Sequence, residues 1–277
     1  MAETAEKFNT AMAGWQEWQD APWGRLRYVI AEANLARHLA DLPAGPLRIL
    51  DVAGGNGADA VRLAARGHHV TIVDHAHAML DAAGERAQAE GLADRITCVQ
   101  AGVDRLPAEV TSTQFDVVLC HNLIQYTDDA RQTLAAALAP LRPGGLLSVI
   151  SANRHSASLT AAIREMDLAA ALAALDTDRG RTRMFDAQLR LRTAEEIQPM
   201  LEELGCRDVH HYGIRSVCDY ITDDARKHDP KFYADLERLE LAVTARHPHK
   251  HTARFFQLIA RTCRTATACR AVRRGGS

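Results

Sequence analysis

The sequence predicts an α/β fold in which a doubly wound parallel sheet is covered by helices on both faces. Two observations predict it. Apolar runs of strand length alternate with helical segments between residues 46 and 153, an order that is typical of parallel sheets. The first apolar run also ends in a glycine-rich turn, "DVAGGNG", and small residues there let a ligand approach the backbone at a strand end.

The bulk composition is that of a globular protein. The chain has 277 residues, 47% of them hydrophobic and 25% charged, with a formal net charge of −2. This charge excludes a global positive field that recruits nucleic acid, although it leaves room for local basic patches. No apolar run is long enough to span a membrane. Six scattered cysteines without a CxxC pair indicate a reducing cytoplasmic location and no structural zinc.

Seven strands are expected. Residues 1–45 precede them as a helical cap that carries all three tryptophans and ends at Pro43 and Gly45. The first five strands are "LRILDVA", "HHVTIVD", "ITCVQA", "FDVVLCHN" and "PGGLLSVISAN", with helices after the first, second and fourth. The last two are "CRDVHHYGIRSV" and "RFFQLIART".

Two helical insertions interrupt the expected core domain of residues 46–262. The first, near 154–190, is polar and Arg-rich and contains one helical piece, "LTAAIREMDLAAALAAL". The second, near 216–250, contains the helix "PKFYADLERLELAVTAR". Between them, Thr193 with Glu196 three residues later predicts a helix opened by a capping box. Residues 263–277 read as a basic, flexible tail.

The spacing of small residues in the turn separates two cofactor classes. Asp74 ends the second strand, where a carboxylate suits a ribose diol in either class. The dinucleotide fingerprint needs a further glycine three residues past Gly57, and the sequence has none there. Asp59, near the start of the following helix, would also repel a pyrophosphate. A sulfonium amino acid carries no phosphate, so the pattern favours S-adenosyl-L-methionine (SAM) over a nicotinamide dinucleotide.

With these motifs in place, the chain resembles the class I SAM-dependent methyltransferases. The resemblance rests on "LDVAGGNG", "VD", "FDVVLCHNLIQY" and "LRPGGLLSVI" and covers most of residues 47–262. It implies a Rossmann-like seven-stranded sheet with helical lid insertions. Ala53 departs from the family, which usually has its first glycine there. Alanine fits if this position does not need a positive φ, and we expect only slight crowding.

A closer similarity is to the bacterial family that methylates the carboxylate of carboxymethoxyuridine in tRNA. It extends over nearly the whole chain, through "GRLR", "RGHHV", "VLCHNLIQY", "LEELGC" and "GIRSVCDY". The match is looser in residues 154–195 and after 220. Related enzymes act on different acceptors, so the similarity transfers the fold more safely than the substrate.

The resemblance implies a set of cofactor-binding residues. Asp74 would bind the ribose of SAM, although it could instead cap the next helix. The small residues of the turn would line the methionine part, and Asp51 would organise its amino end. Arg27 would pair with its carboxylate, although an arginine usually lies on a solvated face. The turn residues are Ala53, Gly54, Gly55 and Gly57.

Adenine is expected after the third strand, in "QAGVDRLP". Many class I enzymes have an acid at the position of Gly102. Since this chain lacks it, Val103 is expected to pack on the ring, and Asp104 or a backbone group to take the hydrogen bond.

The expected catalytic residues are His121, Tyr126 and Arg215. His121 ends the fourth strand, where it can contact the cofactor, orient the acceptor or act as a base. A buried core histidine is the alternative. Arg215 follows the sixth strand and can hold an acidic acceptor. The residues expected to line the same mouth are Asn122, Gln125 and Tyr126.

The acceptor stays open between a small molecule and tRNA. A carboxylate is ionised near neutral pH and needs no general base, whereas a hydroxyl or amine would need His121 as base. The sequence shows no strong dyad around His121, which favours the carboxylate. Two alternative functions are a nicotinamide-dependent oxidoreductase and a SAM-binding protein without catalysis. The oligomeric state is open between monomer and homodimer.

An arginine run and a histidine-rich stretch are both expected to lie on the surface without a specific ligand. Arg179, Arg181 and Arg183 could touch RNA phosphate, but a run of charges usually forms a solvated face. The stretch "HPHKH" suggests a metal site at His247, His249 and His251. No carboxylate or cysteine nearby in the sequence completes a ligand set, so a surface loop without metal is expected.

Overall fold

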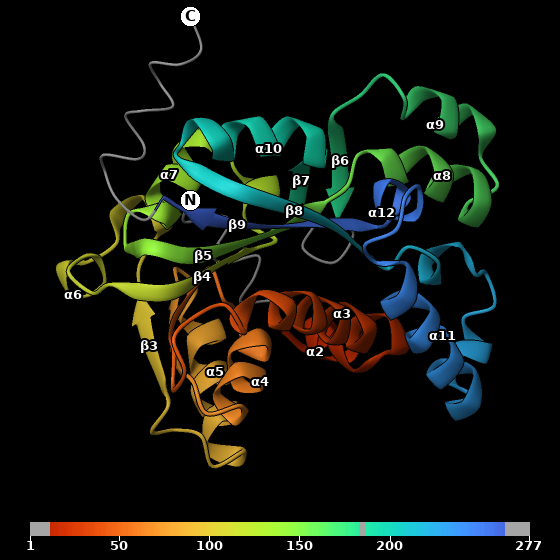
Figure 1. The fold of residues 1–277 in the computed structure, drawn as a ribbon. Helices are drawn as coiled ribbons and strands as arrows, with labels where there is room; N and C mark the ends of the chain where they lie inside the picture. Colours follow the sequence, from red (N-terminus) through yellow and green to blue (C-terminus); the bar gives the residue numbers. More distant parts are fainter. Residues whose placement is uncertain (1–11, 183–186, 264–277) are drawn as a thin grey trace, which may run out of the picture.

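The computed structural model describes residues 12–182 and 187–263, and within them seven strands form one sheet (Figure 1). The strand order is β3-β2-β1-β4-β5-β9-β8. The strands from β3 to β5 are parallel, whereas β9 is antiparallel to both β5 and β8. The predicted seven-stranded doubly wound sheet is therefore confirmed. Its strands are β1 (Arg48–Val52), β2 (His69–Asp74), β3 (Ile96–Gln100), β4 (Phe115–His121), β5 (Leu141–Ala152), β8 (Cys206–Ile214) and β9 (Phe255–Thr262).

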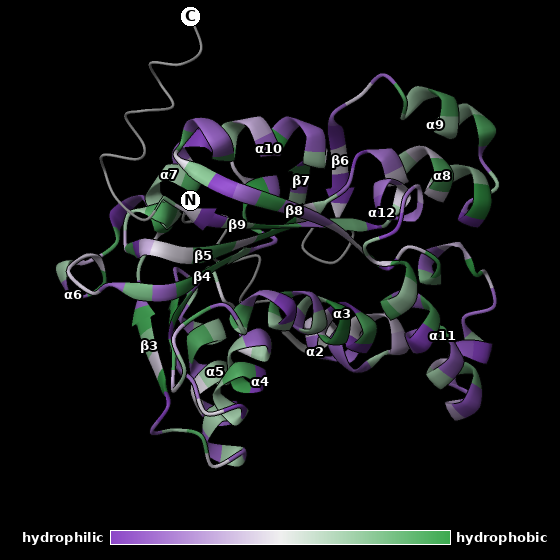
Figure 2. Cartoon of the chain, viewed as in Figure 1, coloured by the Kyte–Doolittle hydropathy of each residue, from purple (hydrophilic) through white to green (hydrophobic). Residues whose placement is uncertain are grey.

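Helices cover both faces of the sheet. In Figure 1, α2 (Met12–Asp20), α3 (Pro22–Leu39), α4 (Ala58–Ala65) and α5 (His77–Ala89) lie on one side, and α7 (Ala130–Leu138) and α10 (Ala194–Glu203) on the other. A short helix, α6 (Ala108–Thr111), lies before β4. The helices carry hydrophobic beside hydrophilic colour in Figure 2, as amphipathic helices over a sheet do. No helix in the described ranges is long and apolar enough to cross a membrane.

Alternation along the strands builds two cores, one on each face. Ile49 of β1 packs in the cluster that contains Leu63 of α4. Its neighbour Leu50 packs in the opposite cluster, with Leu134 of α7. Successive strand residues point to opposite faces. Because both faces are covered, both sets of side chains are apolar, which explains the unbroken apolar runs of the sequence.

The segment from 154 to 190 differs from its prediction. It forms two helices, α8 (His155–Arg164) and α9 (Leu168–Ala173), instead of one. Met166 has a positive φ of 52°, so α8 cannot continue through it. Asp167 then caps the N-terminus of α9 by accepting from the Ala170 amide at 2.8 Å. A two-stranded hairpin of β6 (Arg179–Thr182) and β7 (Ala187–Arg190) follows. Its short polar strands carry no apolar alternation, so it was not predicted.

Capping contacts fix the elements around the last strands. The predicted capping box is present: Thr193 Oγ1 accepts from the Glu196 amide, and the Glu196 carboxylate accepts from the Thr193 amide. The second insertion contains α11 (Pro230–Val243) and the short α12 (His249–Thr252). From α11, buried Glu240 accepts the amides of residues 216, 217 and 218 at 2.7–2.9 Å. This clamp fixes the turn that follows β8.

Candidate active site

Three strands end in the same unusual way at one edge of the sheet. Directly after β1, β4 and β8 stand Ala53, Asn122 and Arg215, with φ values of 57°, 56° and 61°. Left-handed backbone is unfavourable for residues other than glycine and concentrates at functional sites. The expectation for Ala53 was therefore wrong, because the position does need a positive φ. Alanine takes on that conformation because the turn around it is held on both sides.

The glycine turn is tied to the second strand by Asp74. One carboxylate oxygen of Asp74 accepts from the Gly55 amide at 3.0 Å, and the other accepts from the Ala76 amide at 2.9 Å. A Cβ on Gly54 would lie 2.7 Å from the carboxylate of Asp51, so only glycine fits there. The predicted ribose ligand thus also organises the turn. Each of its oxygens keeps a lone pair for a further donor.

A buried chain of charges links the N-terminal cap to the end of β4. Arg27 donates from Nη1 to both carboxylate oxygens of Asp59, at 2.7 and 2.6 Å. Asp59 Oδ2 lies 3.0 Å from His121 Nδ1. Burial alone would raise the pKa of Asp59, but Arg27 and His121 beside it hold that pKa below its usual range. Asp59 was missed as a site residue. Its place in the first turn of the helix after the glycines was the available signal.

His121 is fixed at both ring nitrogens, with Nε2 lying 2.9 Å from Ser148 Oγ. The sequence predicted no dyad at His121. This prediction was wrong, since Asp59 forms a dyad with His121. Burial lowers the pKa of His121 more than Asp59 raises it, so the ring is neutral near pH 7. With both nitrogens bonded inside the protein, the ring would have to give up its contact with Ser148 before it could take a proton from an acceptor.

Several buried polar atoms at this edge have no hydrogen-bond partner. They are Asp51 Oδ2, Arg27 Nε and Asn122 Oδ1, from the ends of β1 and β4 and from α3. Burial, and then the neighbouring charge of Asp59, raises the pKa of Asp51 well above its usual range despite Arg27. Buried polar groups are normally satisfied. Two acceptors and one cationic donor therefore fit a bound group that carries both an ammonium and a carboxylate, as the methionine part of SAM does.

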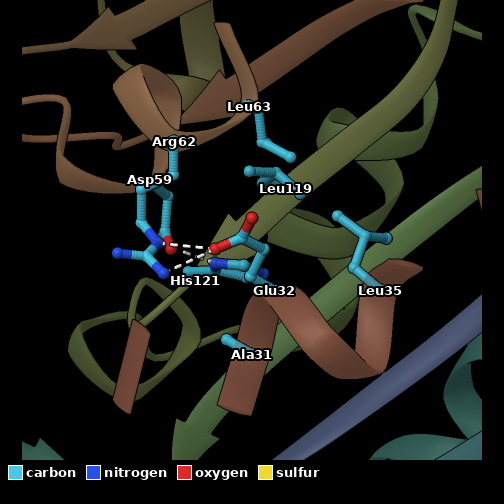
Figure 3. Close-up of a pocket in the computed structure, with 8 residues that line it drawn as sticks. All are labelled: Ala31, Glu32, Leu35, Asp59, Arg62, Leu63, Leu119 and His121. Carbon is cyan, nitrogen blue, oxygen red and sulfur yellow. Dashed lines mark hydrogen bonds and ion pairs between the residues drawn. The ribbon is translucent and has the colours of Figure 1, made fainter. Parts of the chain in front are cut away.

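A cavity adjoins the Asp59–His121 pair on the side of α3 and α4 (Figure 3). Its volume is about 10 Å³, close to the space that one water molecule needs. It is too small for an acceptor, so it belongs to the support of the site. Its lining comprises Ala31, Glu32, Leu35, Asp59, Arg62, Leu63, Leu119 and His121.

The expected adenine contacts lie in a short 3₁₀ turn, Val103–Arg105, after β3. Val103 is half-buried and packs on the core under α7. Asp104 is exposed and lies 3.8 Å from Arg105. The turn thus offers one apolar and one acidic side chain at the place where adenine was expected to bind.

The loop after β4 is built from predicted mouth residues. Gln125 is buried, and its Oε1 accepts from the Ala152 amide at 2.8 Å, so it joins the loop to β5. Tyr126 ends a 3₁₀ turn, Ile124–Tyr126, and burial raises its pKa to about 12. Tyr126 therefore stays protonated at neutral pH and can donate a hydrogen bond but cannot act as a base.

Arg215 lies at the same edge as His121, because β8 runs parallel to β4 and β5. Its Nε and Nη2 donate to the carboxylate of Asp219, with Nε at 2.6 Å. Its Nη1 is buried without a partner, as is Ser216 Oγ. The rings of Trp18 and Phe255 lie 5.5 Å from the guanidinium. The cation is thus held rigidly, with one donor unused.

Helix α2 joins the two halves of the site. Trp18 contacts Arg215, and the next residue, Gln19, exchanges hydrogen bonds with Asn56 of the glycine turn at 2.8 and 3.0 Å. Gln19 also donates to Tyr28 Oη at 2.6 Å. Within the described residues, α2 therefore packs against the turn.

The remaining predicted groups lie beside this edge: strand β7 of the hairpin packs against the 124–126 turn, and the carbonyl of His251 accepts from Asn153 after β5. Arg179 is mostly exposed and pairs with Asp178 at 3.6 Å, while Arg183 lies outside the described residues. In the "HPHKH" stretch, the reason given against a metal was wrong. Folding brings Glu195 Oε1 to 2.8 Å from His251 Nδ1, so a carboxylate does join the histidines.

Comparison with known proteins assigns the chemistry. A family described as "Methyltransferase domain" matches residues 49–145. The tRNA 5-carboxymethoxyuridine methyltransferase of Escherichia coli K12 is 28% identical over 94% of both chains. The ubiquinone biosynthesis O-methyltransferase of Rickettsia felis is 27% identical over 54% of this chain and 60% of its own length.

Solved structures share the fold over most of the chain. The magnesium protoporphyrin IX methyltransferase of Synechocystis, with S-adenosylhomocysteine bound, has a TM-score of 0.61 at 16% identity and covers 93% of this chain and 97% of its own. A SAM-dependent methyltransferase of Thermotoga maritima, a possible histamine N-methyltransferase, has a TM-score of 0.60 at 16% identity, over 93% and 99%. These structures show the class I fold, and the sequence matches, together with the glycine turn, identify the chain as a SAM-dependent methyltransferase.

Proposed function

We propose that the enzyme methylates a carboxylate oxygen, and that its acceptor is the carboxymethoxy group of a wobble uridine in tRNA. The observation that carries the proposal is the unused Nη1 donor of Arg215, buried at the same sheet edge as His121. A planar guanidinium is well suited to hold a carboxylate. The similarity to the E. coli tRNA enzyme over 94% of both chains supports the same acceptor.

The chain's own residues then need only to bind and orient. SAM supplies a methyl group on a sulfonium, which is already a good leaving group. Asp51, Asp74 and the glycine turn would hold the cofactor, and Arg27 would pair with its carboxylate. Arg215 and Ser216 place the acceptor carboxylate, and Trp18 covers it. A carboxylate is ionised near neutral pH, so alignment and exclusion of water carry the catalysis.

The size of the acceptor is the second element of the proposal. A net charge of −2 favours a small acceptor. The exposed Arg179 on the β6–β7 hairpin, whose side chain is 60% exposed, is available to an RNA phosphate and favours tRNA. A tRNA acceptor would place the reaction in the cytoplasm.

The test compares acceptors at equal concentration. Purified protein is first titrated with SAM by calorimetry, then given bulk tRNA that carries carboxymethoxyuridine, the free nucleoside, and a phenol. Methyl transfer is followed by mass spectrometry. Ester formation much faster on tRNA than on the nucleoside supports the proposal. Equal rates on both would assign a small carboxylate, and transfer to the phenol alone would refute a carboxylate acceptor.

A second candidate is an O- or N-methyltransferase that uses His121 as base, which the Asp59–His121 pair at 3.0 Å favours. General bases contribute about 10²–10⁴-fold in rate. His121→Asn should lower kcat less than about tenfold if His121 only supports the site. A loss beyond about 10²-fold, together with loss of the acidic limb of the pH–rate profile, would establish the base.

A further inference from the structure

Three side chains of types that can bind a metal lie together outside the cofactor site, where α10, β8 and α12 meet. Glu195 lies in the first turn of α10, His211 on β8 and His251 on α12. One possible ligand atom from each lies within 4.8 Å of the other two. The residues are remote in sequence, so the fold, and not a local motif, creates the cluster.

The geometry is close to that of a shared tetrahedral ion. Zn²⁺ binds nitrogen and oxygen at about 2.0–2.1 Å, which puts ligand atoms roughly 3.3 Å apart and the centroids of two bound imidazoles roughly 5 Å apart. The rings of His211 and His251 have centroids 5.0 Å apart and lie at 88° to each other. Glu195 Oε1 and His251 Nδ1 are 2.8 Å apart. Small side-chain rotations close the set.

Two of these side chains have unused nitrogen atoms. His211 Nε2 and His251 Nε2 are both buried and have no hydrogen-bond partner. Such atoms call for an explanation, of which an ion is one. His251 meets the carboxylate through Nδ1, on the other side of its ring from Nε2, so the independent indication of an ion is the unpartnered Nε2 of His211.

Two further histidines and one positively charged side chain lie beside the cluster. The ring of His247 lies 4.2 Å from that of His251, and His155 Nε2 lies 3.4 Å from Glu195 Oε2. Neither belongs to the group of three whose ligand atoms lie within 4.8 Å of one another, so the fourth ligand is left to water. Lys250 acts on His211 as a repelling charge, which the carboxylate of Glu195 offsets.

We propose that Glu195, His211 and His251 bind one divalent transition-metal ion of the zinc class. Imidazole with carboxylate is a ligand set that suits Zn²⁺ and excludes Mg²⁺ as the preferred ion. The ion fastens α10 and α12 to β8 at the base of the insertions. Asn153, at the end of β5, donates to the carbonyls of residues 251 and 253 at 2.9 Å, so the clamp is connected to the strand before α8.

The test uses full-length protein without a polyhistidine tag, dialysed against a chelator. Zn²⁺ and Mg²⁺ are titrated separately by calorimetry, Co²⁺ is followed by its visible spectrum, and the unfolding temperature is measured with and without Zn²⁺. One equivalent of Zn²⁺ should bind and raise the unfolding temperature, and Co²⁺ should give the intense bands of four-coordination. Mg²⁺ should give no binding heat.

Variants separate this site from surface histidines. His211→Ala and His251→Ala should weaken Zn²⁺ binding at least roughly 100-fold, while His249→Ala, exposed in the same stretch, should leave it unchanged. Glu195→Gln, on an exposed position, keeps the test valid if an alanine variant fails to fold. No Zn²⁺ binding by the parent protein, or equal binding by all four variants, would overturn the proposal.

Discussion

Two buried arginines stand on either side of the candidate site, and their surroundings differ. Arg27 and Arg215 are 2% and 5% exposed, and each donates to one carboxylate. Each also has one buried N–H group without a partner, Nε in Arg27 and Nη1 in Arg215. A buried cation with an unused donor is costly unless a ligand completes it. Both positions therefore fit the anionic groups that we propose for the cofactor and the acceptor.

The partners of the two cations show how the site is divided. The carboxylate bonded to Arg27, that of Asp59, is shared with His121 at the end of β4, so this cation belongs to a network in the sheet. Arg215 pairs locally with Asp219, four residues on, and is flanked by Trp18 and Phe255. The first arrangement suits a constant ligand, the cofactor. The second can change without disturbing the sheet, which suits an acceptor that varies between relatives.

The largest effect is expected from Arg215→Met. Loss of the carboxylate-binding donor should lower kcat/KM for the carboxylate acceptor about 10²–10³-fold and leave SAM affinity within about threefold. The measurement is methyl-ester formation beside SAM calorimetry.

Arg215→Met also leaves the buried Asp219 without its bonded partner, with only the more distant charges of Arg254 and Lys227 near it, at a cost of up to about 3–5 kcal/mol of stability. The matched control is Arg215→Met with Asp219→Asn, which removes that charge. A double variant that recovers full activity would show that Arg215 only holds the fold and would end its role in acceptor binding.

Arg27→Met is expected to weaken SAM binding and to have little effect on the acceptor, which is the opposite of Arg215→Met. A charge-assisted hydrogen bond contributes about 1.5–3 kcal/mol, so the Kd for SAM should rise about 10–100-fold, with a smaller change in acceptor KM at saturating SAM. Arg66→Met serves as the control, since Arg66 is 56% exposed and pairs with Glu32 of α3. If acceptor KM rises while the Kd for SAM is unchanged, the two arginines have been assigned the wrong way round.

The sequence was sufficient for the sheet because the apolar runs that form it are local signals. The glycine turn and Asp74 were also predictable, since their spacing along the chain reflects one strand–turn–helix unit. The capping box at Thr193 is of the same kind: both of its partners lie within four residues.

The charge network could not be predicted, because it depends on contacts between remote segments. Asp59 meets Arg27 and His121 from separate elements, and Glu195 meets His211 and His251 only after β8 joins the sheet edge. The backbone of Ala53 was missed for another reason. Alanine ordinarily avoids a positive φ, and the surrounding turn overrides that local preference.

Asp51→Asn should separate stability from cofactor binding. Burial raises the pKa of Asp51 in the folded state, so wild-type stability relative to the variant is lost as pH rises from the unfolded value, near 3.9, through the folded one. Near pH 7 the variant should therefore be about 1–3 kcal/mol more stable without ligand, yet bind SAM at least about tenfold more weakly. Urea unfolding at pH 5 and pH 8 measures the gap, which should widen with pH. A gap that narrows would show that the carboxylate is already satisfied in the free protein.

The smallest effect is expected at Ala53, the first of the three left-handed strand ends. A left-handed conformation costs a non-glycine residue about 1–2 kcal/mol. Glycine avoids this cost, but it loses more chain entropy on folding, which offsets about 0.5–1 kcal/mol of the gain. Ala53→Gly should therefore stabilise the protein by roughly 0.5–1 kcal/mol, seen as a higher urea midpoint with an unchanged m-value. Ala82→Gly, inside α5, is the control and should destabilise by a similar amount. If both substitutions lower the midpoint alike, the turn does not strain Ala53, and the left-handed backbone shared by the ends of β1, β4 and β8 would have to be explained without stored strain.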